Sequence, residues 1–366
     1  MLKRRDMMIG GTLLASLPQW GLAQTHLPEC FKPFSKDTKT IQYPAKKGPY
    51  RIALANGFVG NTWRIQMIKS LKAYANTPEI KPQIKELKIV STGTDVAAQI
   101  GAIDNFINAG FDAILTIAVS PTAFKPVIKR AKDAGVVLIP FDNVLDTDEV
   151  IQVNEDQFEM GRMMGRWLEK NKATSGKILE VRGLPGNSVD RDRHDGLQEV
   201  LKASGKKWET IEVIGKWDDP TAQKVTADAI AVHKRFVGIA SQGGDTGVVQ
   251  AMIDAKHPFV PFSGETENGF RKFCAKYAGE GLKCSSGGTG PAQVAVAIKT
   301  AIAALEGKVL PQSIKLPLST VEDPNFKDGA NFYANQSDNF FVGNAFPSCG
   351  INFSAQEIMG QTEANK

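Results

Sequence analysis

Polar and aromatic side chains recur just past the ends of the predicted strands of this sequence, where residues of their types could bind a ligand. Carboxylates accept paired hydrogen bonds from hydroxyl groups, Arg and Asn side chains donate hydrogen bonds, and Trp offers a flat apolar face. That mixture suits an uncharged, polyhydroxylated ligand, whereas an anion would call for more cations and for helix N-termini. The candidate binding residues are Asn61, Trp63, Arg64, Ser120, Asp142, Asn143, Arg193, Trp217, Gln242, Asp245, Ser263 and Glu265.

No motif of catalysis or of cofactor binding accompanies these residues. The sequence has no GxxxxGK[ST], HExxH or GxSxG pattern, and 287–290 lacks the third glycine of a dinucleotide-binding motif. Asp192, His194 and Asp195 fall within one helical turn, and we interpret them as solvated helix charges. We therefore expect no catalytic residue, no metal site and no cofactor. Each binding candidate also has a structural alternative, because Asp and Asn favour turns and helix N-caps, and Trp63 could anchor its helix.

The elements that must position these residues alternate between short apolar segments and longer amphipathic ones. This alternation predicts parallel strands joined by helical crossovers, with the carboxyl ends of the strands facing one crevice. A Gly-rich turn is predicted at 285–290. The predicted strands are 50–56, 84–92, 111–120, 136–143, 177–183, 208–217, 236–242, 259–264 and 313–321, and the predicted helices are 61–76, 95–110, 121–135, 187–205, 219–234, 244–256 and about 291–307.

The two halves of the chain share a pattern that indicates two similar lobes. "IPFDN" ends at Asn143 and "VPFSG" ends at Gly264, and "AAQ" or "TAQ" stands a comparable distance before each. Gln99 to Asp142 is about 43 positions and Gln223 to Ser263 about 40, with the same elements between them. Asp142 and Ser263 are therefore expected at equivalent strand ends, both aimed at a cleft between the lobes.

The N-terminus has the three parts of a secretory signal. It has a basic start, an apolar run from Met7 to Leu17 that is too short to span a bilayer, and small residues near Gly21–Ala23. Adjacent Arg4 and Arg5 resemble a twin-arginine signal, so the export route stays open. We expect an exported periplasmic protein, with no later segment apolar enough to span a membrane.

The four cysteines are expected to form two disulfides, because exported chains meet an oxidising compartment. Three pairings are possible. Cys274 and Cys284 could close a hairpin-like loop, and Cys30 with Cys349 would tie the two terminal extensions together. A metal site and free buried thiols are the alternatives, although no CxxC pattern supports a metal.

The chain has 366 residues, a length typical of about two domains. Its formal net charge of +5 is too small to indicate nucleic-acid binding, and no basic and aromatic cluster appears.

The chain resembles the periplasmic sugar-binding proteins of ABC transporters, the ribose-binding-protein-like group, from Tyr50 to about Thr320. The motifs that carry the resemblance are "IALAN…NTW", "GFDAILTIAVSP", "AGVVLIPFDN", "GNSVDRDRHDGL" and "FVPFSG". It implies an α/β, type I periplasmic binding protein fold, in which two doubly wound parallel-sheet lobes are joined by a three-crossover hinge. The expected organisation is a signal peptide at 1–23, an N-terminal extension at 24–49, an N-terminal lobe at 50–155 plus 290–319, a C-terminal lobe at 156–289, and a C-terminal extension at 320–366. The extension goes beyond the short members of the family, and its many aromatic residues predict that it packs on the body.

The resemblance also suggests roles for individual residues. Asn61 and Trp63 match an Asn-Pro-aromatic segment, Asp142 a sugar-binding Asp and Arg193 a sugar-binding Arg, while Trp217 matches an aromatic wall and Gln242 a binding amide. The family often has Asp where Ser263 stands and Arg where Asn143 stands, so the ligand is expected to differ from ribose.

These features together predict a solute-binding protein rather than an enzyme. Its expected partners are a monosaccharide or polyol and an ABC permease, and it is expected to be a monomer that binds no nucleic acid. An exported carbohydrate-active α/β enzyme and a co-ligand of a chemoreceptor remain alternatives. A sugar-responsive repressor would need an N-terminal helix-turn-helix, where a signal sequence stands instead.

Overall fold

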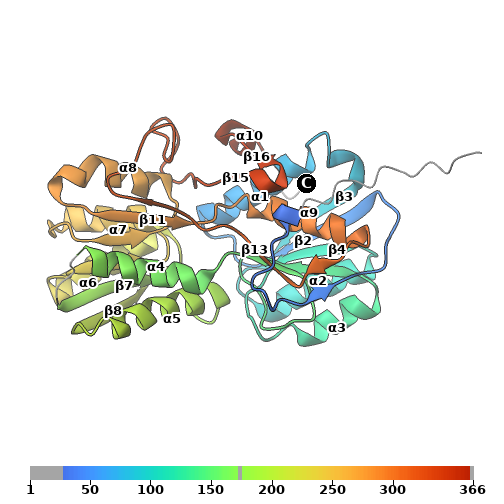
Figure 1. The fold of residues 1–366 in the computed structure, drawn as a ribbon, viewed down its shortest axis with the longest axis horizontal. Helices are drawn as coiled ribbons and strands as arrows, with labels where there is room; N and C mark the ends of the chain where they lie inside the picture. Colours follow the sequence, from blue (N-terminus) through green and yellow to red (C-terminus); the bar gives the residue numbers. More distant parts are fainter. Residues whose placement is uncertain (1–27, 172–174, 363–366) are drawn as a thin grey trace, which may run out of the picture.

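The computed structural model describes residues 28–171 and 175–362, and in them the chain forms two α/β lobes side by side (Figure 1). The first lobe has a parallel sheet of order β3-β2-β4-β5. The second has a sheet of order β14-β11-β10-β9-β7-β8, in which only the edge strand β14 is antiparallel to its neighbour. This confirms the predicted fold class, while the predicted signal segment 1–23 lies outside the described residues.

The first lobe contains four strands of its sheet and four helices. They are β2 (Tyr50–Asn56), α1 (Thr62–Ala75), β3 (Ile84–Ser91), α2 (Val96–Asn108), β4 (Ala113–Ile117), α3 (Lys125–Asp133), β5 (Val137–Pro140) and α9 (Gln293–Leu305). α1 and α9 pack on one face of the sheet, and α2 and α3 on the other. Strands β4 and β5 are buried along their whole length, as expected for parallel strands covered on both faces.

The second lobe contains six strands of its sheet and five helices. They are α4 (Gln157–Lys170), β7 (Gly176–Arg182), α5 (Ser188–Ala203), β8 (Trp208–Ile214), α6 (Asp219–His233), β9 (Gly238–Ser241), α7 (Asp245–Asp254), β10 (Phe262–Gly264), α8 (Asn268–Tyr277), β11 (Cys284–Gly288) and β14 (Ser319–Glu322). No element was predicted at α4 or α8. A turn was predicted where β11 runs, because Ser and Gly have low strand propensity, but β11 lies between β10 and β14 and pairs with both.

Three crossovers connect the lobes, as the resemblance implied. β6 (Gln152–Asn154) leads into α4, β11 leads into α9, and β13 (Ser313–Lys315) leads into β14. β6 pairs with β13 in parallel, and Phe141 bridges Val153 just past β5. The segment 313–321, predicted as one strand, is therefore two strands in different sheets. The predicted C-terminal extension from residue 320 begins inside β14.

Helices α4 and α5 cross at unusually short range. A Cβ atom added at Gly161 would lie 2.0 Å from the Arg193 carbonyl oxygen, and one added at Gly196 would lie 2.0 Å from the Phe158 carbonyl oxygen. Glycine lowers helix propensity, but here it lets two backbones touch. This contact seats the part of α5 that carries Arg193.

Both extensions pack on the lobes through short elements. The elements of the extensions are η1 (Pro28–Cys30), β1 (Thr40–Ile41), β15 (Ala345–Phe346), η4 (Pro347–Cys349), β16 (Ile351–Asn352) and α10 (Ala355–Met359). The lobes have three further short elements, η2 (Lys81–Gln83), η3 (Ala278–Glu280) and β12 (Leu310–Pro311). β1 pairs with β12, and α10 contacts α1. No helix within 28–171 and 175–362 is long and apolar enough to cross a bilayer.

The four cysteines form two disulfides, Cys30–Cys349 and Cys274–Cys284. The first ties the two extensions together, as the sequence suggested. The second joins α8 to the start of β11, so it closes a helix-to-strand connection and not the hairpin-like loop that was considered. Both disulfides are buried, the first among the apolar side chains of the first-lobe core and the second in the core of the second lobe.

Candidate functional site

A cavity that is partly open to solvent lies between the lobes. Nine of the predicted binding residues line it: Asn61, Trp63, Arg64, Asp142, Asn143, Arg193, Trp217, Gln242 and Glu265. Six further lining residues were not predicted: Glu155, Val189, Gly243, Glu267, Thr289 and Phe341. The first lobe, the second lobe, two hinge crossovers and the C-terminal extension all contribute to its walls.

The start of α1 positions the first-lobe donors. Asn61 is the N-cap of α1, and its side-chain oxygen accepts the backbone N–H of Arg64. The Arg64 guanidinium donates to Asn56 Oδ1 at 2.9 Å. Because Asn56 is the last residue of β2, this bond holds the guanidinium group at the carboxyl end of that strand. Burial lowers the pKa of Arg64 to about 10, against the opposing effect of Asp142. Arg64 stays charged at neutral pH and keeps further N–H groups for a ligand.

Asp142 stands two residues past β5 in a left-handed backbone conformation, with φ +60°. Left-handed geometry is uncommon for a residue other than Gly, although Asp tolerates it. The Asp142 carboxylate accepts hydrogen bonds from Asn143 Nδ2 at 3.0 Å and Gln293 Nε2 at 3.3 Å, and Arg64 Nη2 lies 3.8 Å away. Burial raises the pKa of Asp142, and the two cleft arginines oppose that rise.

Arg193 is bound almost entirely by the protein. Its Nε donates to Gln157 Oε1 at 2.7 Å, its Nη1 to the Gln242 carbonyl and to Glu265, and its Nη2 to Glu155 at 3.2 Å. Four of its five N–H donors are thus satisfied among the described residues. Arg193 was predicted as a direct sugar ligand and lines the cavity, and its hydrogen bonds also orient the carboxyl groups of Glu155 and Glu265.

Carboxylates outnumber guanidinium groups around the cavity. Asp142, Glu155, Glu265 and Glu267 face Arg64 and Arg193. Burial raises the pKa of Glu265, and it raises that of Glu267 well above the usual range. Glu267 accepts backbone N–H groups of Gly244 and Thr246, which hold its carboxyl group in the second lobe. An anionic ligand would meet a surplus of buried acids.

The buried carboxyl group of Glu155 has a pKa near neutral pH. Burial raises its pKa from 4.5 to about 7, Arg193 opposes this and nearby Glu265 adds to it. Because the folded state binds this proton more tightly than the unfolded state, the stability that protonation supplies is present below pH 4.5 and is lost as the pH rises through about 7.

We therefore expect the Glu155→Gln variant to lose that pH dependence. Relative to the variant, the wild-type protein should lose roughly 3 kcal/mol of stability between about pH 4.5 and 7, from about 1.36 kcal/mol per pKa unit. Urea unfolding at a series of pH values measures it. Parallel stability curves for the two proteins would contradict the assigned cause.

Aromatic side chains close the cavity on several sides. Trp217 adopts φ +57°, and a Cβ atom added at Gly183 would lie 2.1 Å from its indole ring. Glycine at 183 therefore lets the ring lie flat against the backbone. The Trp217 Nε1–H is buried without a hydrogen-bond partner in the part of the chain that the structure describes. It offers a ligand one more donor.

Three predicted site residues lie outside the cavity lining. Ser263 lies within β10, between Ala240 and Ser285 of the neighbouring strands, because β10 continues to Gly264. Glu265, two residues later, reaches the cavity instead. Asp245 accepts the backbone N–H of Glu265 and so holds the backbone of Glu265 in place. Ser120 is half-buried in the loop after β4.

Some residues that line the cavity are not marked by any local pattern in the sequence. Glu155 and Thr289 lie in hinge crossovers, where no apolar strand or amphipathic helix marks a strand end. Phe341 lies in the C-terminal extension, far along the chain from the other lining residues. Gly243 and Glu267 could have been found, since they follow the predicted strands 236–242 and 259–264.

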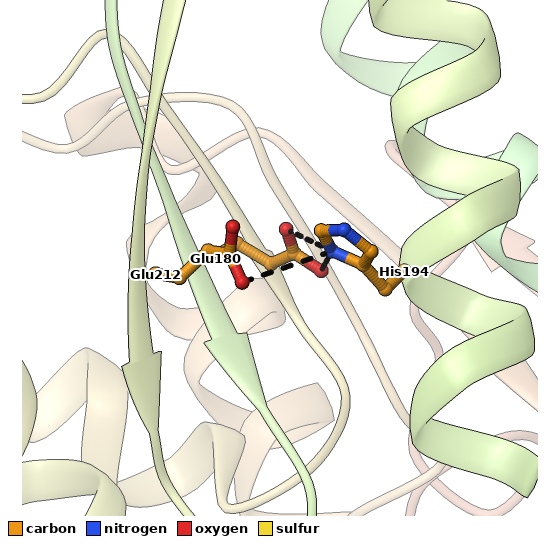
Figure 2. A group of neighbouring side chains, drawn as sticks. All are labelled: Glu180, His194 and Glu212. Carbon is orange, nitrogen blue, oxygen red and sulfur yellow. Dashed lines mark hydrogen bonds and ion pairs between the residues drawn. The ribbon is translucent and has the colours of Figure 1, made fainter. Parts of the chain in front are cut away.

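A second group of acids surrounds His194 on the second-lobe sheet (Figure 2). His194 Nδ1 lies 3.0 Å from both carboxylate oxygens of Glu180 and 4.0 Å from Glu212. Gln198 also donates to Glu180, and Arg182 pairs with Glu212. The hydrogen bond to Glu180 raises the pKa of His194. His194 was interpreted as a solvated helix charge, but it is half-buried and hydrogen-bonded to Glu180, because α5 packs it over β7.

A family model matches most of the chain. The model of the periplasmic binding protein domain matches residues 52–308. The D-ribose/D-allose-binding protein of Pseudomonas aeruginosa is 26% identical over 50% of this chain and 59% of its own length. The xylitol-binding protein of Mycolicibacterium smegmatis is 27% identical over 49% of this chain and 52% of its own length. This chain thus spans somewhat more than half the length of these curated relatives.

A solved structure supports the same assignment. An ABC transporter solute binding protein from Thermobispora bispora superposes with a TM-score of 0.69 at 26% identity, covering 75% of this chain and 85% of that one. The family match runs from β2 to just past α9, so it includes strands and helices of both lobes. The chain belongs to the periplasmic binding protein family.

Proposed function

We propose that this chain is a periplasmic solute-binding protein that captures a neutral sugar or polyol between its lobes and delivers it to an ABC importer. The observation that carries the proposal is the composition of the interlobe cavity. Its buried carboxyl groups outnumber its guanidinium groups, and Trp63, Trp217 and Phe341 add apolar faces. Carboxylates bind hydroxyl groups and repel anions, and apolar faces pack against the C–H surface of a sugar.

The relatives support the same class of ligand. Those named above carry the names of ribose, allose and xylitol, which are all neutral and polyhydroxylated. We propose that the lobes close on such a ligand by rotation at the three crossovers, since only the closed form surrounds it. The protein would act as an exported monomer without catalytic turnover, with the lobe limits 50–155 plus 290–319 and 156–289 and with the N-terminal signal removed.

A thermal-shift screen tests the proposal. The panel comprises D-ribose, D-allose, D-xylose, xylitol and glycerol, with ribose 5-phosphate as the anionic control. A ligand at about 100 times its Kd stabilises the folded state by about 2.7 kcal/mol, which should raise Tm by roughly 5 °C. We expect at least one neutral compound to do so, without chemical change when it is recovered and analysed by NMR. Stabilisation by the phosphate alone, or turnover of the bound sugar, would refute the proposal.

A further inference from the structure

The C-terminal extension is anchored firmly on the second lobe. The side-chain amide of Asn268, at the start of α8, donates to the carbonyl groups of Tyr333, Gln336 and Ser337. The Asn268 side-chain oxygen accepts the backbone N–H of Tyr333 at 2.8 Å. Asn268 is fully buried under this segment. The extension is therefore part of the folded second lobe up to about residue 338.

Beyond residue 338, a short segment of the extension forms hydrogen bonds with both lobes. We call residues 338–344 the strap. On the second-lobe side, the Asn268 N–H donates to the Phe340 carbonyl at 2.8 Å, and the Val342 N–H donates to the Thr266 carbonyl at 3.0 Å. These alternate with bonds to the other lobe, because Phe341 lies between them.

The first lobe holds Phe341 through Gln66 of α1. The Phe341 N–H donates to Gln66 Oε1 at 2.8 Å, and Gln66 Nε2 donates to the Phe341 carbonyl at 2.9 Å. Gln66 Nε2 also donates to Asn344 Oδ1 at 3.2 Å. Gln66 is only 2% exposed, so these bonds are shielded from water. One buried side chain thus satisfies both backbone groups of Phe341.

The strap runs beside the hinge and one of its residues faces the cavity. A Cβ atom added at Gly290, in the crossover from β11 to α9, would lie 2.6 Å from the Gly343 carbonyl oxygen. Phe341 lines the interlobe cavity. After the strap, β15 and the Cys30–Cys349 disulfide fix the chain on the first lobe. Figure 1 shows this C-terminal part passing from the lobe of α8 to the lobe of α1.

We propose that the strap is a fourth connection between the lobes, which restrains their opening and supplies Phe341 as a specificity-determining wall of the ligand site. Bonds to opposite lobes alternate over Phe340, Phe341 and Val342, so the lobes cannot separate here without breaking one set. Opening should release the Gln66 bonds first, because the second-lobe side is held by several more. The wall function rests on the proposed sugar binding, whereas the restraint on opening does not.

Small-angle X-ray scattering of the ligand-free protein tests the restraint. The Gln66→Leu variant keeps the side-chain volume but removes all three bonds to the strap. We expect a larger radius of gyration than in the wild-type protein, and no increase in the control Gln83→Leu, whose exposed amide lies outside the cleft. Superimposable scattering curves for Gln66→Leu and the wild-type protein would overturn the restraint, whether or not any sugar binds.

Calorimetry with the neutral compounds of the thermal-shift panel tests whether Phe341 is a wall of the ligand site. Phe341→Ala should weaken binding of the tightest-binding of these compounds at least tenfold. The matched control is Phe340→Ala, which removes an equally buried ring that contacts Tyr333 rather than the cavity and should change affinity less than threefold. Equal affinities of the two variants for this ligand would contradict the proposal that Phe341 forms a wall of the site. If none of the neutral compounds of the thermal-shift panel binds wild-type protein, the proposed function fails while the scattering result still decides the restraint.

Discussion

Replacing Asp142 with alanine is expected to abolish sugar binding while the fold is retained. Each hydrogen bond to a charged acceptor contributes about 1.5–3 kcal/mol to binding. A buried carboxylate can accept two such bonds from neighbouring hydroxyl groups. The loss should therefore reach at least about 100-fold in Kd, or about 2.7 kcal/mol. Isothermal titration with the tightest ligand of the screen measures it, and unchanged affinity would sink the assignment of Asp142 as a ligand acceptor.

The fold should survive because burial already disfavours the Asp142 charge by raising its pKa. Removing the carboxylate takes away a costly buried charge together with its distant pairing to Arg64. The Asp142→Asn variant separates shape from charge, since Asn also tolerates positive φ. The control Asp148→Ala removes an exposed acid that pairs with Lys39 on the surface. Loss of binding in the control would show that the Asp142 effect is not local.

Removing the Cys30–Cys349 disulfide is expected to have the largest effect on stability. The bond joins residues 319 positions apart, and the chain-entropy relation gives roughly 5–6 kcal/mol for a loop of that length. The Cys274–Cys284 disulfide spans 10 positions, for which the same relation gives roughly 3 kcal/mol. The long disulfide also holds the far end of the strap on the first lobe.

The measurement compares two double variants, Cys30→Ala with Cys349→Ala and Cys274→Ala with Cys284→Ala. All four cysteines are buried, so alanine leaves cavities of similar size in both variants. Urea unfolding should rank the first variant as the less stable by about 3 kcal/mol. A reversed ranking would mean that local packing, and not restriction of the unfolded chain, dominates the contribution of these bonds.

The lobes and most of the cavity could be predicted because parallel strands obey a local pattern. The apolar runs of β4 and β5, each preceded by a glycine, mark buried strands, and their carboxyl ends must face one crevice. Asn61, Arg64 and Asp142 follow from that rule, and the structure brings them together. The rule failed at Ser263, because the duplicated motif matches in sequence but β10 continues past the position that corresponds to Asp142.

Other parts of the site depend on contacts that no local pattern encodes. Glu155 and Thr289 lie in crossovers whose positions depend on how the lobes meet, and Phe341 is held at the cavity by Gln66, 275 residues earlier. The helices α4 and α8 also escaped prediction. α4 carries two glycines, which oppose a helix locally but permit its close contact with α5.

The sequence by itself therefore determined the two-lobed α/β fold, the disulfide candidates and the type of chemistry at the strand ends. The tertiary structure decided how that chemistry is used. Arg193, predicted as a sugar ligand, is held by Gln157, the Gln242 carbonyl, Glu155 and Glu265, at sequence separations of 36 to 72 residues. Hydrogen bonds over such separations form only after long-range packing has placed the partners, so which polar groups remain for a ligand is a property of the fold and not of any segment.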